Sequence, residues 1–308
     1  MEFKIGLRGE YKIETVKIIE GVEKRKLICD WFPNIITNGG LNRVGVSSTY
    51  LDYCHVGSGS ASPSLTDTAL ETFIGASSDV QSSSNVSSGS PDYTMLYTKV
   101  FRFDPGVATG NLSEVGIGWT LATGSLFSRA LILDGVGSPT TITVLADEYL
   151  DVTYRLSLQP PISDFIGSVV FTGSIGGTYD FIIRARAITS VSTGISGWGL
   201  PAAANGVAGQ GGTPNKTNLY SGAIGAITNI NAGTATSVNC VASAYVTDSF
   251  EISYTISADI GQANYAGGIL SAGGRYGLCL YQIGFDPAIP KTSSDILSFV
   301  LNISWGRA

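Results

Sequence analysis

From residue 93 onward the chain is divided into short runs of alternating apolar and polar residues, separated by turns that contain Gly, Pro or Asp. Met95–Phe103 is the clearest run, and it ends at the turn signal Asp104–Gly106. Alternation with a period of two places one face of a strand against a core and the other against solvent. Runs at intervals of about 8–12 residues are typical of β-sandwiches and jelly-roll-like barrels. The pattern therefore predicts an all-β protein.

The same alternation recurs on both sides of the proline pair Pro160-Pro161. Before the prolines, it predicts strands at Leu112–Trp119, Leu126–Leu133, Thr140–Leu145 and Tyr149–Leu158. After them, it predicts strands at Val169–Phe171, Tyr179–Arg186, Val238–Val246, Phe250–Ile256, Gly277–Ile283 and Ile296–Trp305. We therefore predict two tandem β-sandwich or jelly-roll-like domains, residues 32–161 and residues 162–308.

Two pieces of the first half resemble two pieces of the second half. Ala130–Leu133 matches Gly277–Leu280, and Asp147–Leu158 matches Ser294–Trp305, both at an offset of 147 residues. One hypothesis is an internal duplication, in which each domain ends in the same long strand. The alternative is that any two pairs of amphipathic strands look this similar.

Residues 1–31 differ from the rest of the chain in their charge. Residues 1–30 hold 13 of the 42 charged residues, and these alternate with apolar side chains. Gly9-Glu10 and Glu20-Gly21 separate the runs, so we predict two or three short antiparallel strands with one solvated face. We interpret residues 1–31 as a charged N-terminal β-arm for attachment, which docks inward while the second domain projects. The alternative is that they are the first strands of the next domain.

Residues Phe32–Gly75 form a distinct module that carries almost no chemistry. It begins with an apolar turn and continues with a strand-like stretch, Tyr50–Val56, and a flexible Gly-Ser run, Gly57–Ser60. It ends with a short helix-like segment, PSLTDTAL, which Pro63 opens. The apolar turn contains Ile35, Ile36, Leu41 and Val44.

This module resembles the opening of a group of bacteriophage tail and virion structural proteins, in which an NLIT-like, GL-R-G turn precedes VG-G-S-P-TDTAL. The resemblance covers about residues 32–160. Members of that group are non-enzymatic virion components. The resemblance therefore implies a role in particle assembly, and it transfers no active site.

Two stretches read as long loops. Residues 76–92 are Ser-rich and lack the apolar residues that would order them, so we predict an exposed loop. Residues 187–217 are rich in Gly, Ala and Ser. Trp198 in this second loop and Tyr220 just beyond it are either buried anchors or contact residues for a partner or receptor.

The residues that carry chemistry are sparse. Cys29, Cys54, Cys240 and Cys279 show no CxxC spacing and His55 is the sole histidine, so we predict reduced thiols and no zinc site. Cys54 and His55 are neighbours on a strand, where side chains point to opposite faces, which argues against a nucleophile–base pair.

The acidic residues give no clearer site. Glu114 and the group Asp147, Glu148 and Asp151 read as solvent-facing edge charges. A weak cation site at that group and a carboxylate pair for glycoside hydrolysis are the alternatives. We predict no enzyme, no catalytic residues, no metal and no cofactor.

The composition limits the partners. Charged residues are 14% of the chain, against roughly 25% in typical globular proteins, and the net charge is −6. Without a Lys/Arg cluster outside the N-terminus, we expect no nucleic-acid partner. No apolar run reaches the ~18–20 residues of a membrane span, and the first thirty residues are charged, so we expect neither membrane insertion nor a secretory signal.

Together these features predict a structural component of a phage virion: a tail fibre, baseplate or tail-tip protein, made in the host cytoplasm. Many strands and few charges favour side-by-side packing of subunits, so we expect a homo-oligomer, preferably a trimer, bound to other tail proteins. One alternative is a receptor-binding module for a host surface glycan or pilus. Another is a capsid decoration or head-fibre protein.

Overall fold

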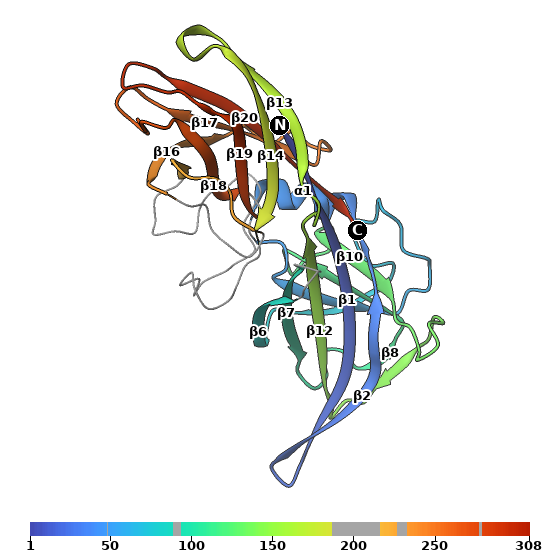
Figure 1. The fold of residues 1–308 in the computed structure, drawn as a ribbon. Coiled ribbons are helices and arrows are strands. Elements are labelled where there is room, and N and C mark those ends of the chain that lie inside the picture. The colour runs from blue at the N-terminus through green and yellow to red at the C-terminus, as the bar shows by residue number, and fades with distance from the viewer. Residues whose placement is uncertain (48, 89–93, 187–215, 227–232, 277–278) are drawn as a thin grey trace.

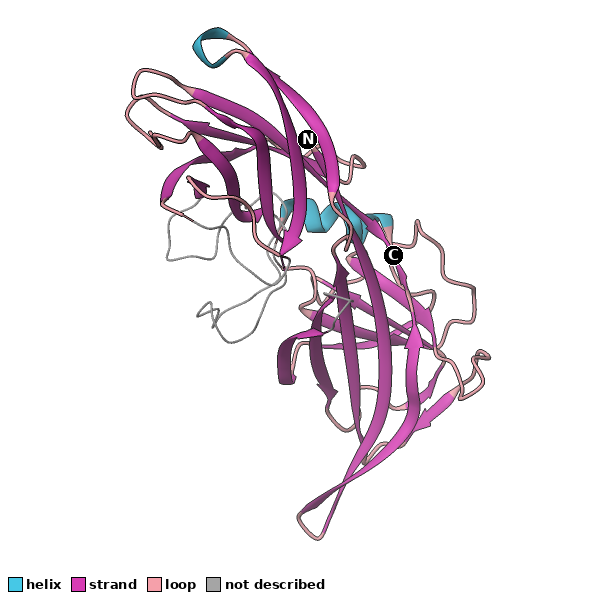
Figure 2. Cartoon of the chain, in the orientation of Figure 1, coloured by secondary structure: helices cyan, strands magenta, loops and turns pink. Residues whose placement is uncertain are grey.

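A computed structural model describes the chain except for residues 48, 89–93, 187–215, 227–232 and 277–278. Strands hold 59% of the residues and helices 5%, so the all-β prediction is confirmed (Figure 2). The strands are β1 (Glu2–Ile19), β2 (Val22–Pro33), β3 (Ile35–Ile36), β4 (Tyr53–Gly57), β5 (Phe73–Ser77), β6 (Val80–Ser88), β7 (Thr94–Phe103), β8 (Gly110–Leu112), β9 (Glu114–Gly118), β10 (Leu126–Leu131), β11 (Ile142–Val144), β12 (Tyr149–Gln159), β13 (Phe165–Phe171), β14 (Gly177–Arg186), β15 (Lys216–Tyr220), β16 (Ala235–Ala242), β17 (Glu251–Ala258), β18 (Ile269–Tyr276), β19 (Cys279–Ile289) and β20 (Leu297–Arg307). The helices are α1 (Asn38–Val46) and the 3-10 turn η1 (Gly173–Ile175). Among the described residues, no helix has the length and apolarity needed to span a membrane.

One large curled sheet runs through both halves of the chain. Its strand order is β13-β14-β19-β18-β15-β16-β17-β20-β1-β12-β7-β6, and β2 is paired to β1 beside this path. A five-stranded sheet, β3-β10-β9-β4-β5, and a two-stranded sheet, β11-β8, complete the described strands. The chain forms two lobes, with β2 to β12 in the first lobe and β13 to β20 in the second, and β1 extends through both (Figure 1).

Strand β1 joins the two lobes. Along one edge its residues 2–7 pair in parallel with β20 and its residues 10–19 pair with β2. Along the other edge residues 6–16 pair antiparallel with β12. The segment that the sequence suggested as an arm therefore contains an interior strand of the large sheet. Its role in attachment stays a prediction.

The alternation in β1 appears directly in its burial. Phe3, Ile5, Leu7, Tyr11 and Ile13 are all buried on the inner face. The predicted break at Gly9-Glu10 is wrong, since β1 is continuous through it.

Gly9 is needed in β1 for a different reason. A Cβ at Gly9 would lie 2.4 Å from the Tyr154 hydroxyl and 2.5 Å from the Asn34 side chain. The predicted turn at Glu20-Gly21 does form, and both residues have positive φ, 53° and 76°, as a two-residue type I′ hairpin turn requires.

Each lobe has a core between layers of sheet. In the first lobe β1 packs against the five-stranded sheet, where a 2.8 Å hydrogen bond joins the hydroxyls of Tyr11 and Ser128. In the second lobe the large sheet curls back on itself. There the ring of Phe3 lies edge-on to Tyr281 with centroids 4.2 Å apart, and Phe285 meets Phe299 at 5.6 Å.

Helix α1 lies at the junction of the lobes (Figure 1). The sequence suggested only an apolar turn here, but Thr37 caps a helix by accepting a 2.8 Å hydrogen bond from the Gly40 amide. From the second lobe, the indole of Trp305 donates to the Leu41 carbonyl at 2.9 Å, and the Tyr245 hydroxyl donates to the Asn42 side chain at 2.7 Å. These bonds fix β20 and the loop before β17 against α1.

The Ser-rich stretch is partly a strand. Residues 76–92 were expected to form an exposed loop, but β6 pairs with β7 over eight residue pairs. An edge strand bonds through its backbone, so it forms here without apolar side chains to order it. Strands β15 and β18, which the sequence pattern missed, also pair within the large sheet.

The two long strands of the duplication hypothesis are both neighbours of β1. β12 is antiparallel to β1, and β20 is parallel to it. The duplication and the division into two tandem domains stay predictions.

We expect Gly9→Ala to destabilise the whole protein by about 1–3 kcal/mol, because the new methyl group overpacks against Tyr154 and Asn34. Since β1 belongs to both lobes, calorimetry should show one unfolding transition that shifts as a unit. Gly135→Ala is the control, because a Cβ there meets nothing within 4 Å. Two transitions, with only one of them shifted, would contradict the role of β1 as the shared strand.

Candidate functional site: a loop clamped by buried charges

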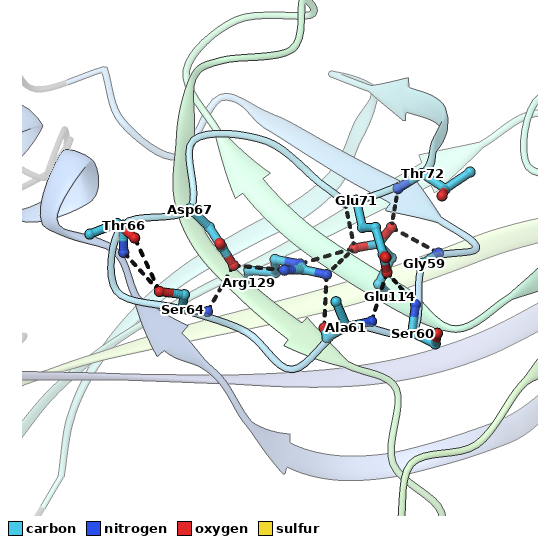
Figure 3. A network of polar contacts seen from close by, with 10 residues as sticks. All are labelled: Gly59, Ser60, Ala61, Ser64, Thr66, Asp67, Glu71, Thr72, Glu114 and Arg129. Atoms are coloured by element: carbon cyan, nitrogen blue, oxygen red, sulfur yellow. Dashed lines mark hydrogen bonds and ion pairs between the residues drawn. The ribbon is translucent and has the colours of Figure 1, made fainter.

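The loop Ser58–Thr72 connects β4 to β5 and belongs to the module that carries the family resemblance. It contains turns and bends but no helix, so the predicted helix-like segment after Pro63 is wrong. A loop of this length inside a compact fold is uncommon and is usually functional or mobile. Here side chains from β9 and β10 hold it in place (Figure 3).

Glu114, at the start of β9, is the centre of the clamp. Its side chain is fully buried, and its two oxygens accept from the amides of Gly59, Glu71 and Thr72 at 2.8–3.1 Å. A fourth donor is Arg129 Nε at 2.9 Å. A carboxylate has about four acceptor positions, so these four donors saturate it.

Arg129, on the neighbouring strand β10, carries the positive charge. Its guanidinium is 4% exposed and donates to Asp67 at 2.7 Å and to the Ala61 carbonyl at 3.0 Å, in addition to Glu114. Burial disfavours the charge, but the bond to Asp67 and the charge of Glu114 outweigh it and raise the pKa of Arg129. One arginine thus ties both arms of the loop to the sheet.

Two further carboxylates shape the loop from within. Glu71 accepts from the amides of Ser60 and Ala61 at 2.6 and 2.7 Å. The bonds from Ala61 and Ser60 lower the pKa of Glu71. Asp67 accepts from the Ser64 amide at 2.8 Å, which closes a local turn from Ser64 to Asp67, directly after Pro63.

Gly57 at the end of β4 and Gly59 in the loop stand where there is no room for a side chain. A Cβ at Gly57 would lie 2.4 Å from the Thr72 carbonyl oxygen, and one at Gly59 would lie 2.4 Å from Glu114 Oε1. The run that reads as flexible in the sequence is therefore closely packed at both glycines.

A second network of buried charge holds the β1–β2 hairpin. Arg102 on β7 makes two 2.8 Å bonds to the fully buried Asp151 on β12 and one of 2.7 Å to Glu23 on β2. Arg25 on β2 also donates to Asp151 at 2.8 Å. The hydrogen bonds to Asp151 and Glu23 raise the pKa of Arg102. The network connects three strands across the outer face of the sheet.

These contacts correct the prediction for the acidic residues. Glu114 and Asp151 are not solvent-facing edge charges, since both are buried and paired with arginine. Asp147 is exposed and pairs with Lys17, while Glu148 accepts from the Leu145 amide. Within the described part of the chain, no cluster of His, Cys, Asp or Glu has the arrangement of a metal site.

A sequence signal for the clamp did exist. Glu114 and Arg129 are each the only charge in an otherwise apolar or small-residue strand, LSEVGIG and LFSRALIL. Lone opposite charges in two consecutive strands predict a buried pair when those strands are neighbours. The sheet order of β9 and β10 confirms that they are neighbours.

The residues singled out for chemistry are separate from the clamp. Cys29, Cys54 and Cys240 are free and buried, as predicted, and burial raises the pKa of each thiol. His55 bonds the Thr120 carbonyl through Nε2 at 2.9 Å, and burial lowers its pKa.

The two predicted contact residues have different outcomes. Tyr220 is half-buried at the end of β15, and its hydroxyl accepts a hydrogen bond from the side-chain Nδ2 of Asn218 at 3.3 Å. Trp198 lies outside the described residues. The contact role of Trp198 and Tyr220 stays a prediction.

A comparison of the chain with known protein families, curated proteins and solved structures found no match. Each charged group of the clamp is bonded within the chain, so the arrangement orders an exposed loop. The outer surface of that loop, residues 58–72, is the candidate site.

We expect Arg129→Met to destabilise the protein by about 3–5 kcal/mol, because it leaves Glu114 buried without its charge partner. Urea unfolding should show the loss, and limited proteolysis should cut within residues 58–72 before the rest of the chain. Arg8→Met is the matched control, since the Arg8–Glu10 pair is on the surface and its loss costs about 0–1 kcal/mol. Equal stability of the two variants would contradict the clamp.

Acid should release the loop through Glu71. Its pKa is lower in the folded protein than in the unfolded chain, so its stabilisation is complete above the unfolded pKa of about 4.3 and is lost as pH falls through the folded value. Hydrogen exchange, corrected for intrinsic rates, should show the Ser60 and Ala61 amides losing protection as the pH falls through the lowered pKa of Glu71. Glu71→Gln should remove this pH dependence. A variant that keeps it would assign the effect to another carboxylate.

Proposed function

We propose that the protein is a non-enzymatic structural component of a bacteriophage virion, a tail fibre, baseplate or tail-tip protein that acts through oligomeric assembly. The observation that carries the proposal is the position of the motif in the fold. The residues of the phage-like motif, including Gly57, Gly59 and Asp67, are the ones that build the clamped loop. A motif devoted to holding an exposed loop in one shape fits a packing surface better than a reaction site.

The buried charges support the same proposal. Glu114, Asp151, Arg102 and Arg129 are bonded to groups of the chain itself. Lys291, 2% exposed, likewise donates to the carbonyls of Asp259, Gln262 and Thr292 and to the Asn264 side chain. Charge is thus used in this chain to fix loops and strands, as a rigid subunit of an assembly requires.

The proposed partners are further copies of this chain, arranged around a three-fold axis, and the other proteins of a tail. This proposal assigns the attachment role to a smaller part of residues 1–31. The base of the β1–β2 hairpin is part of the core, whereas its tip projects from the first lobe (Figure 1). The tip exposes Ile18, Ile19 and Val22 at 48–54%. We assign docking to this tip. We also propose that the chain consists of two tandem domains that arose by duplication.

Immunogold labelling of purified phage particles tests the assignment. An antibody against this chain should label the tail, at the baseplate, tip or fibres. Label on the capsid would replace the proposal with a decoration or head-fibre protein. If the label is on the tail, particles carrying Trp198→Ala or Tyr220→Ala that assemble normally but adsorb poorly would identify a receptor-binding module. Purified particles without label would refute a virion role.

We expect the triple variant Ile18→Thr, Ile19→Thr and Val22→Thr to fold normally but to be missing from particles, because it removes the exposed apolar tip without touching the base of the hairpin. Circular dichroism and thermal unfolding check the fold, and immunoblotting of purified particles measures incorporation. Val136→Thr, at a side chain 87% exposed on another loop, is the control. Normal incorporation of the triple variant would move the docking site elsewhere.

A further inference from the structure

Strand β13 is the last strand at one end of the large sheet. It forms the hairpin at the far end of the second lobe together with β14 (Figure 1). Its seven residues pair with β14 in continuous antiparallel register. Among the described residues no strand pairs with its other edge, so a row of backbone donors and acceptors is free there.

β13 lacks the usual protection of an edge strand. Natural edge strands are blunted by charged residues, proline, bulges or short length. Phe165–Phe171 reads FIGSVVF, with no charge and no proline, and its register with β14 has no bulge. Ile166 and Val170 are each 69% exposed and Phe165 is 44% exposed. The strand at the opposite end, β6, has the sequence VQSSSNVSS, which is mostly serine instead.

The sequence of β13 is nearly symmetric about Ser168. In an antiparallel pair of two such strands centred on Ser168, Phe165 lies opposite Phe171, Ile166 opposite Val170, and Gly167 opposite Val169. Aromatic and β-branched cross-strand pairs of this kind stabilise antiparallel sheets. We propose that β13 pairs with β13 of a second copy of this chain, with Ser168 on the two-fold axis, and so joins their sheets into one.

The charges around β13 allow this pairing. Asp164, the nearest acid in the chain, forms a 2.6 Å ion pair with Arg184 and would lie opposite Thr172 of the second copy. Asp180 is the cross-strand neighbour of Ser168 within one copy. The two copies of Asp180 would then be three strand spacings apart, roughly 14 Å, which exceeds the Debye length of about 8 Å at physiological salt. Neither of these described acids therefore faces a like charge across the contact.

A two-fold contact uses the same strand in both copies, so it closes after two chains and leaves no β13 edge for a third copy. One strand pair buries less than the ~800 Å² per partner of a standard interface, so the contact should be weak and depend on concentration. This contact rests on the proposed assembly role and specifies one surface through which copies of the chain bind each other. It is separate from the proposed three-fold contact. Because it is tested on the purified chain, its failure is distinguishable from failure of the virion assignment.

Cysteine cross-linking tests the register. In the proposed pair the two Ser168 Cα atoms lie about 4.5–5.5 Å apart, within the range for a disulfide. Two Val170 Cα atoms would be four residues apart along the strands, roughly 13 Å, which is too far. Under mild oxidation Ser168→Cys should give a covalent dimer on a non-reducing gel, while Val170→Cys and the unaltered chain should not. Equal cross-linking of the two variants, or none in Ser168→Cys, would overturn the proposal.

A charge exchange tests the pairing without a covalent bond. Ile166→Lys with Val170→Lys places lysine opposite lysine twice, so light scattering should show half the mass of the unaltered chain at the same concentration. Ile166→Lys with Val170→Glu places lysine opposite glutamate twice and should keep the full mass. Self-pairing would be contradicted if both double variants lost mass, or if both kept the mass of the unaltered chain. Open-ended aggregates of the unaltered chain would exclude the closed two-fold contact.

Discussion

The fold depends on the backbone pairing of one strand. β1 hydrogen-bonds to β20 and β2 along one edge and to β12 along the other, so the first nineteen residues connect strands from both ends of the chain. Contacts of such high sequence separation form only when most of the chain is present, since the closure entropy of the long intervening loop must be offset. Helix α1 reinforces the same junction through Trp305 and Tyr245. The two lobes are therefore parts of one hydrogen-bonded structure.

Buried charge has a consistent use around this frame. Glu114 with Arg129 fixes the long loop between β4 and β5, and Asp151 with Arg102 fixes the base of the β1–β2 hairpin. Each carboxylate is saturated or nearly saturated by hydrogen bonds, which offsets the large desolvation cost of burying it. Both networks hold segments that reach the surface. Rigid exposed segments on a sheet with open edges are suited to packing against other subunits, which agrees with the proposed assembly role.

Sequence patterns predicted the strands with clear alternation better than the strands that lack it. Strands such as β7, β12 and β20 follow a period-two pattern and were predicted within one or two residues. β6 was missed because it is ordered by its backbone pairing to β7, which leaves no trace in its Ser-rich side chains. The segment that Pro63 opens is helix-like in sequence, yet Asp67 and the neighbouring Glu71 belong to a loop without helix. Their carboxylates instead bond Arg129 and the Ser60 and Ala61 amides.

The sequence by itself determined the all-β class, the inward face of most described strands and the buried state of the three described thiols, because these follow from local alternation and apolarity. Only the tertiary structure decided that Glu114 and Asp151 are buried, that β1 is an interior strand and that the Gly-Ser run is a packed loop. These features depend on which strands become neighbours, and a period-two pattern is the same for every possible neighbour. Sheet order, set by long-range pairing, is therefore what turned isolated charges and glycines into a clamp.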